Sequence, residues 1–215
     1  MALLLHDYFR SSASYRVRIA LNLKGLPYRQ QPHHLAKGEH RAPDYLRINP
    51  QGLVPALVDG DVTITQSIAI LEYLEEAYPD TRRLLPAAPA GRARVRSLSA
   101  IVAADTHPLN NLRVLKYLDT ELGLDEPART AWYHHWLKEC FDAFEARLQD
   151  EPETGRFCHG DDPTMADICL VPQIFNAKRF AFDLAAYSAV MRIFDAAQAL
   201  DAFAMAAPDR QPDAE

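Results

Sequence analysis

The chain has 215 residues, of which 48% are hydrophobic and 24% charged, so it can bury a sizeable core in one large domain or two small ones. Its net charge of −6 argues against nucleic-acid binding, which requires a basic surface. Its three cysteines lack C-x-x-C spacing, as is typical of a reducing compartment without disulfides. The apolar run at the start ends at Asp7, too early for a signal peptide, and no stretch reaches the roughly 18 apolar residues of a membrane span. We therefore expect a cytoplasmic protein that binds neither nucleic acid nor membranes.

Residues 1–82 carry alternating strand and helix signals. A short apolar strand at 3–9 leads through a serine-rich turn into a helix at 15–24, which Gly25 and Pro27 stop. Residues 28–34 return as a second strand, and a strand–helix–strand unit of this size predicts a parallel pair.

Two apolar runs, 53–58 and 62–65, flank an Asp-Gly turn and predict a β-hairpin. A helix follows at 68–78. The order is β-α-β and then β-β-α, which predicts an α/β domain over residues 1–82.

A proline-containing linker at 79–89 leads into a region with helical periodicity only, so we expect a second, all-α domain at 90–215. We predict one helix from 91 to about 122, bent at Pro108, because proline removes a backbone donor. A second helix is predicted at 128–149. The remaining predictions are a helix from Thr164 that Pro172 kinks or ends early, shorter helical pieces over 186–206, and a loose polar end over 208–215.

Several segments, in one order along nearly the whole chain, resemble the zeta class of soluble glutathione transferases. They are 8–21 (YFRSSASYRVRIAL), 49–57 (NPQGLVPAL), 65–70 (TQSIAI), 107–115 (HPLNNLRVL) and 160–172. The resemblance implies a thioredoxin-like N-terminal domain with an all-α C-terminal domain, glutathione as cofactor, and a homodimer. It also implies an activity similar to that of maleylacetoacetate isomerases of tyrosine catabolism, which convert a cis enedione dicarboxylate into its trans isomer.

The serine-rich turn 11–14 is the first candidate for catalysis. Serine is a preferred helix cap, which is its structural interpretation, but the resemblance implies that a hydroxyl here donates to the glutathione thiolate. A free thiol has a pKa near ~8.5, so lowering it by about two units requires roughly 2.7 kcal/mol. A charge-assisted hydrogen bond of roughly 1.5–3 kcal/mol, helped by the helix dipole, suffices. Ser11 is the first choice for this role and Ser12 the second.

Many zeta-class members have a cysteine where this chain has Ala13. The nucleophile is therefore expected to be the sulfur of glutathione and not a protein thiol.

Three further features extend the predicted glutathione site. Val54-Pro55 is either an edge-strand proline or, by the resemblance, a cis pair whose backbone contacts the cysteinyl unit. Gln66-Ser67 caps a helix, and such an N-terminus also suits the γ-glutamyl carboxylate. His40 is expected at the glycine end. Together with the helical domain, the implied glutathione-binding set is Ser11, Ser12, Ala13, Ser14, Tyr15, Arg16, His40, Val54, Pro55, Gln66, Ser67, His107, Asn111, Leu112 and Arg113.

Arg10, Arg113 and Arg179 are predicted to bind the substrate carboxylates. A lone arginine is most often a solvated surface charge, but guanidinium groups match planar carboxylates, and an acidic protein must concentrate positive charge where it binds a dianion. Arg10 also follows a buried strand beside the serine turn, and we expect it to take part in catalysis.

Two other patterns are expected to have no role in the chemistry. Thr164 and Asp167 have the spacing of a helix capping box, which predicts a structural role. The histidine pairs at 33–34 and 134–135 predict no metal site, because adjacent residues on a helix do not face one another.

Three alternative functions remain open at this level. Maleylpyruvate is one methylene shorter than maleylacetoacetate, a difference worth only ~1–3 kcal/mol, and no residue decides between them. A general conjugating transferase or dehalogenase would be expected to lack the arginines. The third is a non-catalytic glutathione-binding or scaffold protein, against which the intact set of Ser11, Val54, Gln66 and Ser67 argues.

Overall fold

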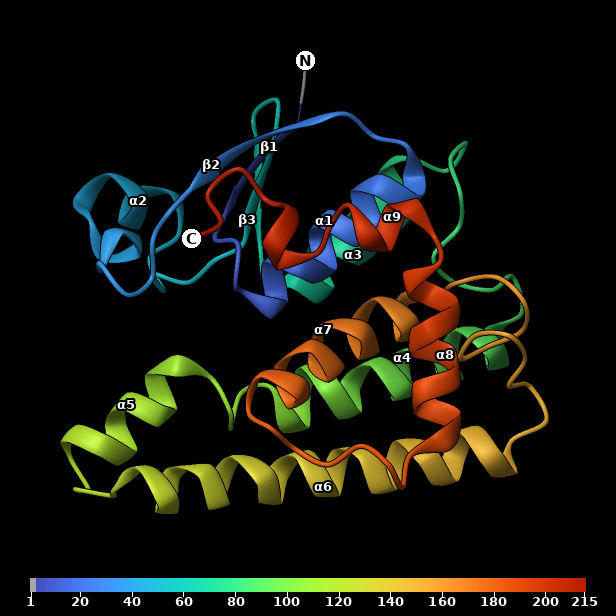
Figure 1. Cartoon of the computed structure of the whole chain (residues 1–215). Coiled ribbons are helices and arrows are strands. Elements are labelled where there is room, and N and C mark those ends of the chain that lie inside the picture. Colours follow the sequence, from blue (N-terminus) through green and yellow to red (C-terminus); the bar gives the residue numbers. More distant parts are fainter. Residues whose placement is uncertain (1–2) are drawn as a thin grey trace. The chain divides into compact units, whose positions relative to one another are not determined.

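The four predicted strands form one mixed sheet in the computed structural model, which describes residues 3–215 (Figure 1). They are β1 (Leu3–Asp7), β2 (Tyr28–Pro32), β3 (Ala56–Asp59) and β4 (Val62–Thr65). The sheet order is β2-β1-β3-β4, with β1 and β2 parallel and β3 antiparallel to both β1 and β4. The predicted parallel pair and hairpin are therefore confirmed, and Gly60, with a φ of 58°, forms the hairpin turn.

Helices α1 (Ser12–Lys24) and α3 (Ser67–Ala77) contact each other and belong to the same unit as the sheet. Its core contains the fully buried side chains of Leu5, Ile19 and Leu57. The 3₁₀ turn η1 (Glu39–Arg41) and α2 (Pro43–Ile48) connect β2 to β3.

Helix α1 begins earlier than predicted. Its predicted start is residue 15, whereas the serine-rich segment itself forms the first turn, with Ser11 as the N-cap. A serine side chain that accepts a backbone N–H offsets the weak helix propensity of the serines that follow.

The chain divides into two compact units. The first comprises the residues up to Leu84 together with Gln198–Glu215, and the second comprises Leu85–Ala197. The last segment, Gln198–Glu215, predicted to belong to the helical domain, is part of the first unit instead. This segment contains α9 (Asp201–Ala204), which packs on α1, and the 3₁₀ turn η3 (Pro208–Arg210).

The loose end predicted over 208–215 is wrong, because this segment is held by side-chain hydrogen bonds. The Gln211 amide is buried and donates to the carbonyls of Met205 (3.0 Å) and Ala207 (2.8 Å), and it accepts from Gln30 on β2 (2.9 Å).

The second unit is helical, as predicted. Its elements are α4 (Pro89–Ala100), the π-helical turn η2 (Ile101–Thr106), α5 (Leu112–Thr120), α6 (Glu126–Asp150), α7 (Met165–Arg179) and α8 (Ser188–Gln198). Within residues 3–215, no helix is both long and apolar enough to cross a membrane.

The single bent helix predicted from 91 to about 122 is wrong. Helix α4 passes into η2, the helical pattern stops at the Pro108 region, and α5 starts afresh. Asn111 caps α5 by accepting the backbone N–H of Arg113 (3.1 Å). A proline followed by an N-cap residue makes it more favourable for a second helix to begin than for one helix to continue through a bend.

Helix α7 begins with the predicted capping box. The Asp167 carboxylate is fully buried and accepts hydrogen bonds from the Thr164 N–H (2.7 Å) and Oγ1 (2.9 Å) and from the Cys158 N–H (2.8 Å). The helix continues past Pro172 to Arg179, so the expected early end does not occur.

Candidate functional site

The turn between β1 and α1 carries the predicted catalytic serines. The Ser11 Oγ accepts the Ser14 N–H (3.2 Å), so its own hydroxyl hydrogen remains free to donate. Ser12 is buried beside it, and Ser14 is fully buried with no hydrogen-bond partner for its Oγ within residues 3–215. The structural and functional roles of Ser11 are therefore compatible, since one uses its lone pair and the other its proton.

The backbone of this turn is supported by Arg18, whose side chain is fully buried on α1. Its guanidinium donates to the carbonyls of Phe9 (2.9 Å) and Tyr8 (3.4 Å) and forms an ion pair with Asp7 (3.1 Å). Burial raises the pKa of the Asp7 carboxyl, and the adjacent Arg18 charge opposes that rise. Arg18 is not among the predicted site residues, although an arginine that interrupts the apolar positions of a helix could have identified it.

Val54-Pro55 is a cis peptide, as the resemblance implies. The preceding loop is tied down at the Leu53 carbonyl, which accepts hydrogen bonds from the Tyr45 hydroxyl (2.6 Å) and the Asn49 side-chain amide (2.6 Å). Gly52 is required here, because its φ is 58° and a Cβ would lie 2.9 Å from the Arg41 side chain.

The predicted carboxylate site lies at the N-terminus of α3. Gln66 occupies the N-cap position with a φ of 70°, an unfavourable conformation for a residue with a side chain, and its amide donates to Gln51 Oε1 (2.7 Å). The buried Arg16 of α1 donates to the Ser67 Oγ (3.2 Å). A guanidinium beside a helix N-terminus favours an anion twice over, through its charge and through the helix dipole.

His40 is half-buried in η1, and its carbonyl lies 3.0 Å from where a Cβ on Gly52 would be. The structure thus brings His40 close to the loop that precedes the cis peptide. Ala13 and Tyr15 lie in the first turn of α1, where Tyr15 is buried against the Phe203 carbonyl (3.4 Å).

Arg10 is exposed, yet its side chain is oriented. Its Nε and Nη2 donate to the Tyr8 hydroxyl (3.2 and 3.0 Å), and its guanidinium lies 5.0 Å from the centre of the Phe9 ring. A guanidinium has five N–H donors, so three remain for a carboxylate.

The predicted residues of the second unit lie at two places near α6. His107, Asn111, Leu112 and Arg113 surround the break between η2 and α5, and Leu112 and Arg113 are exposed. Arg179 is the exposed last residue of α7, beside Phe180. The Phe180 ring stacks on Tyr133 of α6 (3.7 Å between ring centres). Asn110 of the break donates to the Tyr133 carbonyl (3.2 Å), so Tyr133 contacts both segments.

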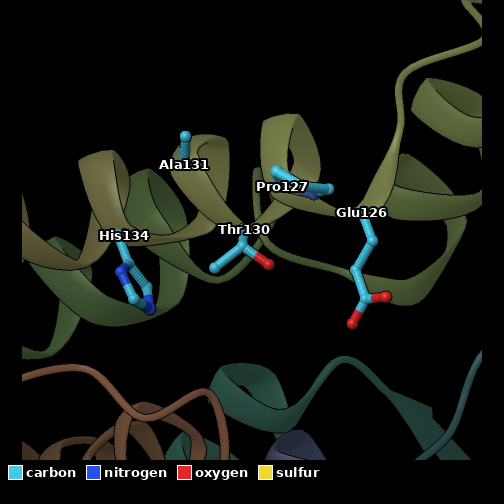
Figure 2. Close-up of a pocket in the computed structure, with 5 residues that line it drawn as sticks. All are labelled: Glu126, Pro127, Thr130, Ala131 and His134. Carbon is cyan, nitrogen blue, oxygen red and sulfur yellow. The ribbon is translucent and has the colours of Figure 1, made fainter.

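A hollow of about 490 Å³ along α6 is lined by Glu126, Pro127, Thr130, Ala131 and His134. Figure 2 shows these five side chains. The side chains of Glu126, Thr130 and His134 project from the same side of the helix. None of the lining residues is in the predicted site. Its lining residues include an acidic side chain, Glu126, and neither an arginine nor a lysine, so this hollow is not suited to a dicarboxylate.

Within the described residues, no group of three or more His, Cys, Asp or Glu side chains is placed to hold a metal ion.

Comparisons with known proteins bear on both units. The family model described as "Glutathione S-transferase, N-terminal domain" matches residues 1–76, and the corresponding C-terminal domain model matches residues 130–204. Maleylacetoacetate isomerase of Rhizobium meliloti is 53% identical over 207 residues, which cover 96% of each chain. Maleylpyruvate isomerase of a Ralstonia species is 50% identical over 209 residues, covering 97% of this chain and 98% of that protein.

Two solved structures extend the similarity to the fold. The holo structure of a maleylpyruvate isomerase, a bacterial zeta-class enzyme, has a TM-score of 0.96 at 50% identity, covering 99% of this chain and 100% of the other. A maleylacetoacetate isomerase from Methylobacterium extorquens, with bound malonate and glutathione, has a TM-score of 0.94 at 45% identity and covers 99% of each chain.

Proposed function

Because this chain belongs to the glutathione transferase family, in the zeta class with the maleylacetoacetate and maleylpyruvate isomerases, we propose that it is a glutathione-dependent cis–trans isomerase. Its proposed reaction converts maleylacetoacetate to fumarylacetoacetate. The observation that carries the proposal is the turn at 10–11, where a helix-capping serine with a free hydroxyl hydrogen stands beside an oriented arginine. Ser11 can donate a hydrogen bond to a thiolate, and Arg10 can bind a carboxylate.

The residues of the first unit fit glutathione. The buried Arg16 and the N-terminus of α3 at Gln66-Ser67 match the γ-glutamyl carboxylate, and the Val54 backbone at the cis peptide matches the cysteinyl unit. His40 is assigned to the glycine end. Glutathione, when bound, supplies the thiol sulfur that adds to the conjugated double bond and leaves it again, so it is not consumed.

Ser11 is proposed to stabilise the thiolate by donating its hydroxyl hydrogen, with Ser12 as the alternative donor. The Ser11 lone pair is held by the Ser14 N–H, which fixes the hydroxyl at the positive end of the α1 dipole. This geometry provides a hydrogen bond and the field of the helix dipole. Together they can lower the thiol pKa by about two units, which requires roughly 2.7 kcal/mol.

Arg10, Arg113 and Arg179 are proposed to bind the two substrate carboxylates and to hold the substrate while its central bond rotates. All three side chains are exposed and able to meet a dianion. Arg10 is the best oriented, since Tyr8 and Phe9 fix its guanidinium.

Maleylpyruvate is the second candidate substrate. Relatives of both names match this chain at similar identity, 53% for the Rhizobium enzyme and 50% for the Ralstonia enzyme. The two substrates differ by one methylene, worth only ~1–3 kcal/mol of discrimination.

The proposal extends to a cytoplasmic homodimer acting in tyrosine catabolism. The family resemblance supports the dimer and the pathway. The three cysteines are buried and form no disulfide within residues 3–215, which agrees with a reducing compartment.

The test follows the absorbance of each cis enedione with glutathione at one tenth of the substrate concentration and without glutathione. The proposal expects complete conversion only when glutathione is present, with the higher kcat/KM on maleylacetoacetate. A higher value on maleylpyruvate would reassign the substrate. Conversion that stops when glutathione is used up would indicate a conjugating transferase, and no conversion of either compound would indicate a non-catalytic glutathione-binding protein.

A further inference from the structure

Arg10 rests on two aromatic side chains that belong to the same stretch of chain. The Tyr8 hydroxyl accepts two of its N–H groups, and the Phe9 ring lies under its guanidinium. Tyr8 and Phe9 are both buried, with about 5% of each exposed. The direction in which Arg10 points therefore depends on what fixes these two residues.

The Phe9 peptide is held on both sides by charged groups. The Arg18 guanidinium donates to its carbonyl (2.9 Å), and the Asp213 carboxylate accepts its N–H (3.1 Å). Asp213 is 204 residues away in the sequence, in the C-terminal segment (residues 211–215). Hydrogen bonds to charged groups are worth roughly 1.5–3 kcal/mol, about twice a neutral one.

The Tyr8 ring is supported by the same C-terminal segment through His34. The two rings lie 5.0 Å apart, and the His34 Nε2 is 3.2 Å from the Glu215 carboxylate. Glu215 also pairs with Lys37 (3.2 Å). Both residues beneath Arg10 are thus connected to carboxylates at the end of the chain.

The C-terminal segment is itself anchored. Gln211 bonds to the Met205 and Ala207 carbonyls and to Gln30 of β2, and Gln30 also donates to Asp7 (3.0 Å). Figure 1 shows this red segment returning to the blue strands of the first unit. The anchor places Asp213 and Glu215 at the carboxyl end of β1, where the candidate turn begins.

We propose that Asp213 is a positioning residue that orients Arg10 for the substrate carboxylate through the Phe9 backbone N–H, with Glu215 in a lesser supporting role. Ser11 depends less on this contact, because its hydroxyl is fixed by Ser14 and its own N–H donates to the Tyr8 carbonyl (2.9 Å). The inference rests on the proposed function in taking Arg10 as the carboxylate ligand.

The test compares Asp213→Ala with the wild type in two assays. The first is isomerisation, with KM and kcat for the enedione and KM for glutathione. The second is binding of malonate to the glutathione-loaded protein by calorimetry, which requires no turnover. We expect the enedione KM and the malonate Kd to rise about tenfold, as a misoriented charge pair predicts, and the glutathione KM to stay within about twofold.

Two further variants separate positioning from folding. Asp213→Asn keeps an oxygen that accepts the Phe9 N–H, so it should restore most of the affinity for both ligands. Asp209→Ala removes the same charge from an exposed position on η3 and should change neither constant. In a double-mutant cycle, Arg10→Ala with Asp213→Ala should be no worse than Arg10→Ala alone.

The outcomes of the proposed function and of this inference can be told apart. A wild type that isomerises neither compound overturns the proposed function, while the malonate arm still tests the positioning role. An unchanged malonate Kd in Asp213→Ala, or additive losses in the double variant, would overturn the inference. An equal loss of glutathione and malonate binding would overturn it as well, because that pattern indicates general disruption of the turn.

Discussion

The two units hold their predicted site residues in different ways. In the first unit these residues are fixed by buried partners, such as Arg16 on Ser67 and the Ser14 N–H on Ser11. In the second unit Leu112, Arg113 and Arg179 are exposed at helix ends. Its most deeply buried polar group, Asp167, serves the capping box and none of the predicted chemistry. The difference indicates that the predicted cofactor site of the first unit is preorganised. In the helical unit, by contrast, the buried polar contacts of Asp167 contribute to stability.

The largest effect is expected from Asp167→Ala. It removes three hydrogen bonds to a buried carboxylate and leaves the Cys158 and Thr164 donors unsatisfied, so we expect the free energy of unfolding to fall by about 3 kcal/mol. Urea unfolding measures it, with Asp150→Ala, an exposed carboxylate at the end of α6, as the control. A loss below about 1 kcal/mol would contradict the conclusion that the buried contacts of Asp167 stabilise the second unit.

The next largest effects are expected from the three predicted substrate-binding arginines, which should differ in how much activity each contributes. Arg10 is oriented by Tyr8 and Phe9, so we expect Arg10→Ala to lower kcat/KM for isomerisation by roughly 100-fold while conjugation of a neutral electrophile to glutathione is spared. Arg113→Ala and Arg179→Ala should cost about tenfold each, since within the described part of the chain these guanidinium groups lack the two hydrogen bonds that orient Arg10 and lose more entropy on binding. Steady-state kinetics on both substrate types measures this. Equal losses from all three variants would contradict a preorganised first unit.

A smaller effect concerns pH and stability of the first unit. Burial, helped by the charge of the nearby His33, lowers the pKa of His6 from 6.5 to about 4. Between pH 6.5 and 4 the unfolded state therefore binds more protons, and the folded state loses stability as the pH falls. Thermal melts across this range should show a shallower slope for His6→Gln than for the wild type. His135→Gln, at an exposed position on α6, should leave the slope unchanged, and a steeper slope in His6→Gln would reverse the assignment.

Much of the fold could be predicted because its signals are local. The Asp-Gly turn, the stop at Gly25 and the Thr164–Asp167 spacing each act within a few residues, and each occurs as predicted. The break before α5 could not be predicted in the same way. Pro108 indicated a disruption, but whether the helix bends or restarts depends on its packing partners.

The same limit applies to the site. The residues at Ser11, Val54 and Gln66 follow from motifs, whereas the support of Phe9 by Arg18 and Asp213 joins positions far apart in the sequence. A polar end at 208–215 gives no sign that Gln211 is buried, because its partners lie on β2 and in the turn after α9. Sequence patterns therefore predicted groups for contact with ligands but gave no indication of the residues that hold those groups in place.

The central claim is that the first unit ionises glutathione through Ser11, and ultraviolet titration of the bound thiol tests it most directly. We expect the thiol pKa on the wild type to lie about two units below its free value, and on Ser11→Ala to rise by about one unit, which corresponds to roughly 1.4 kcal/mol for the lost hydrogen bond. Ser12→Ala serves as the comparison variant. A pKa that does not change in Ser11→Ala would contradict the claim.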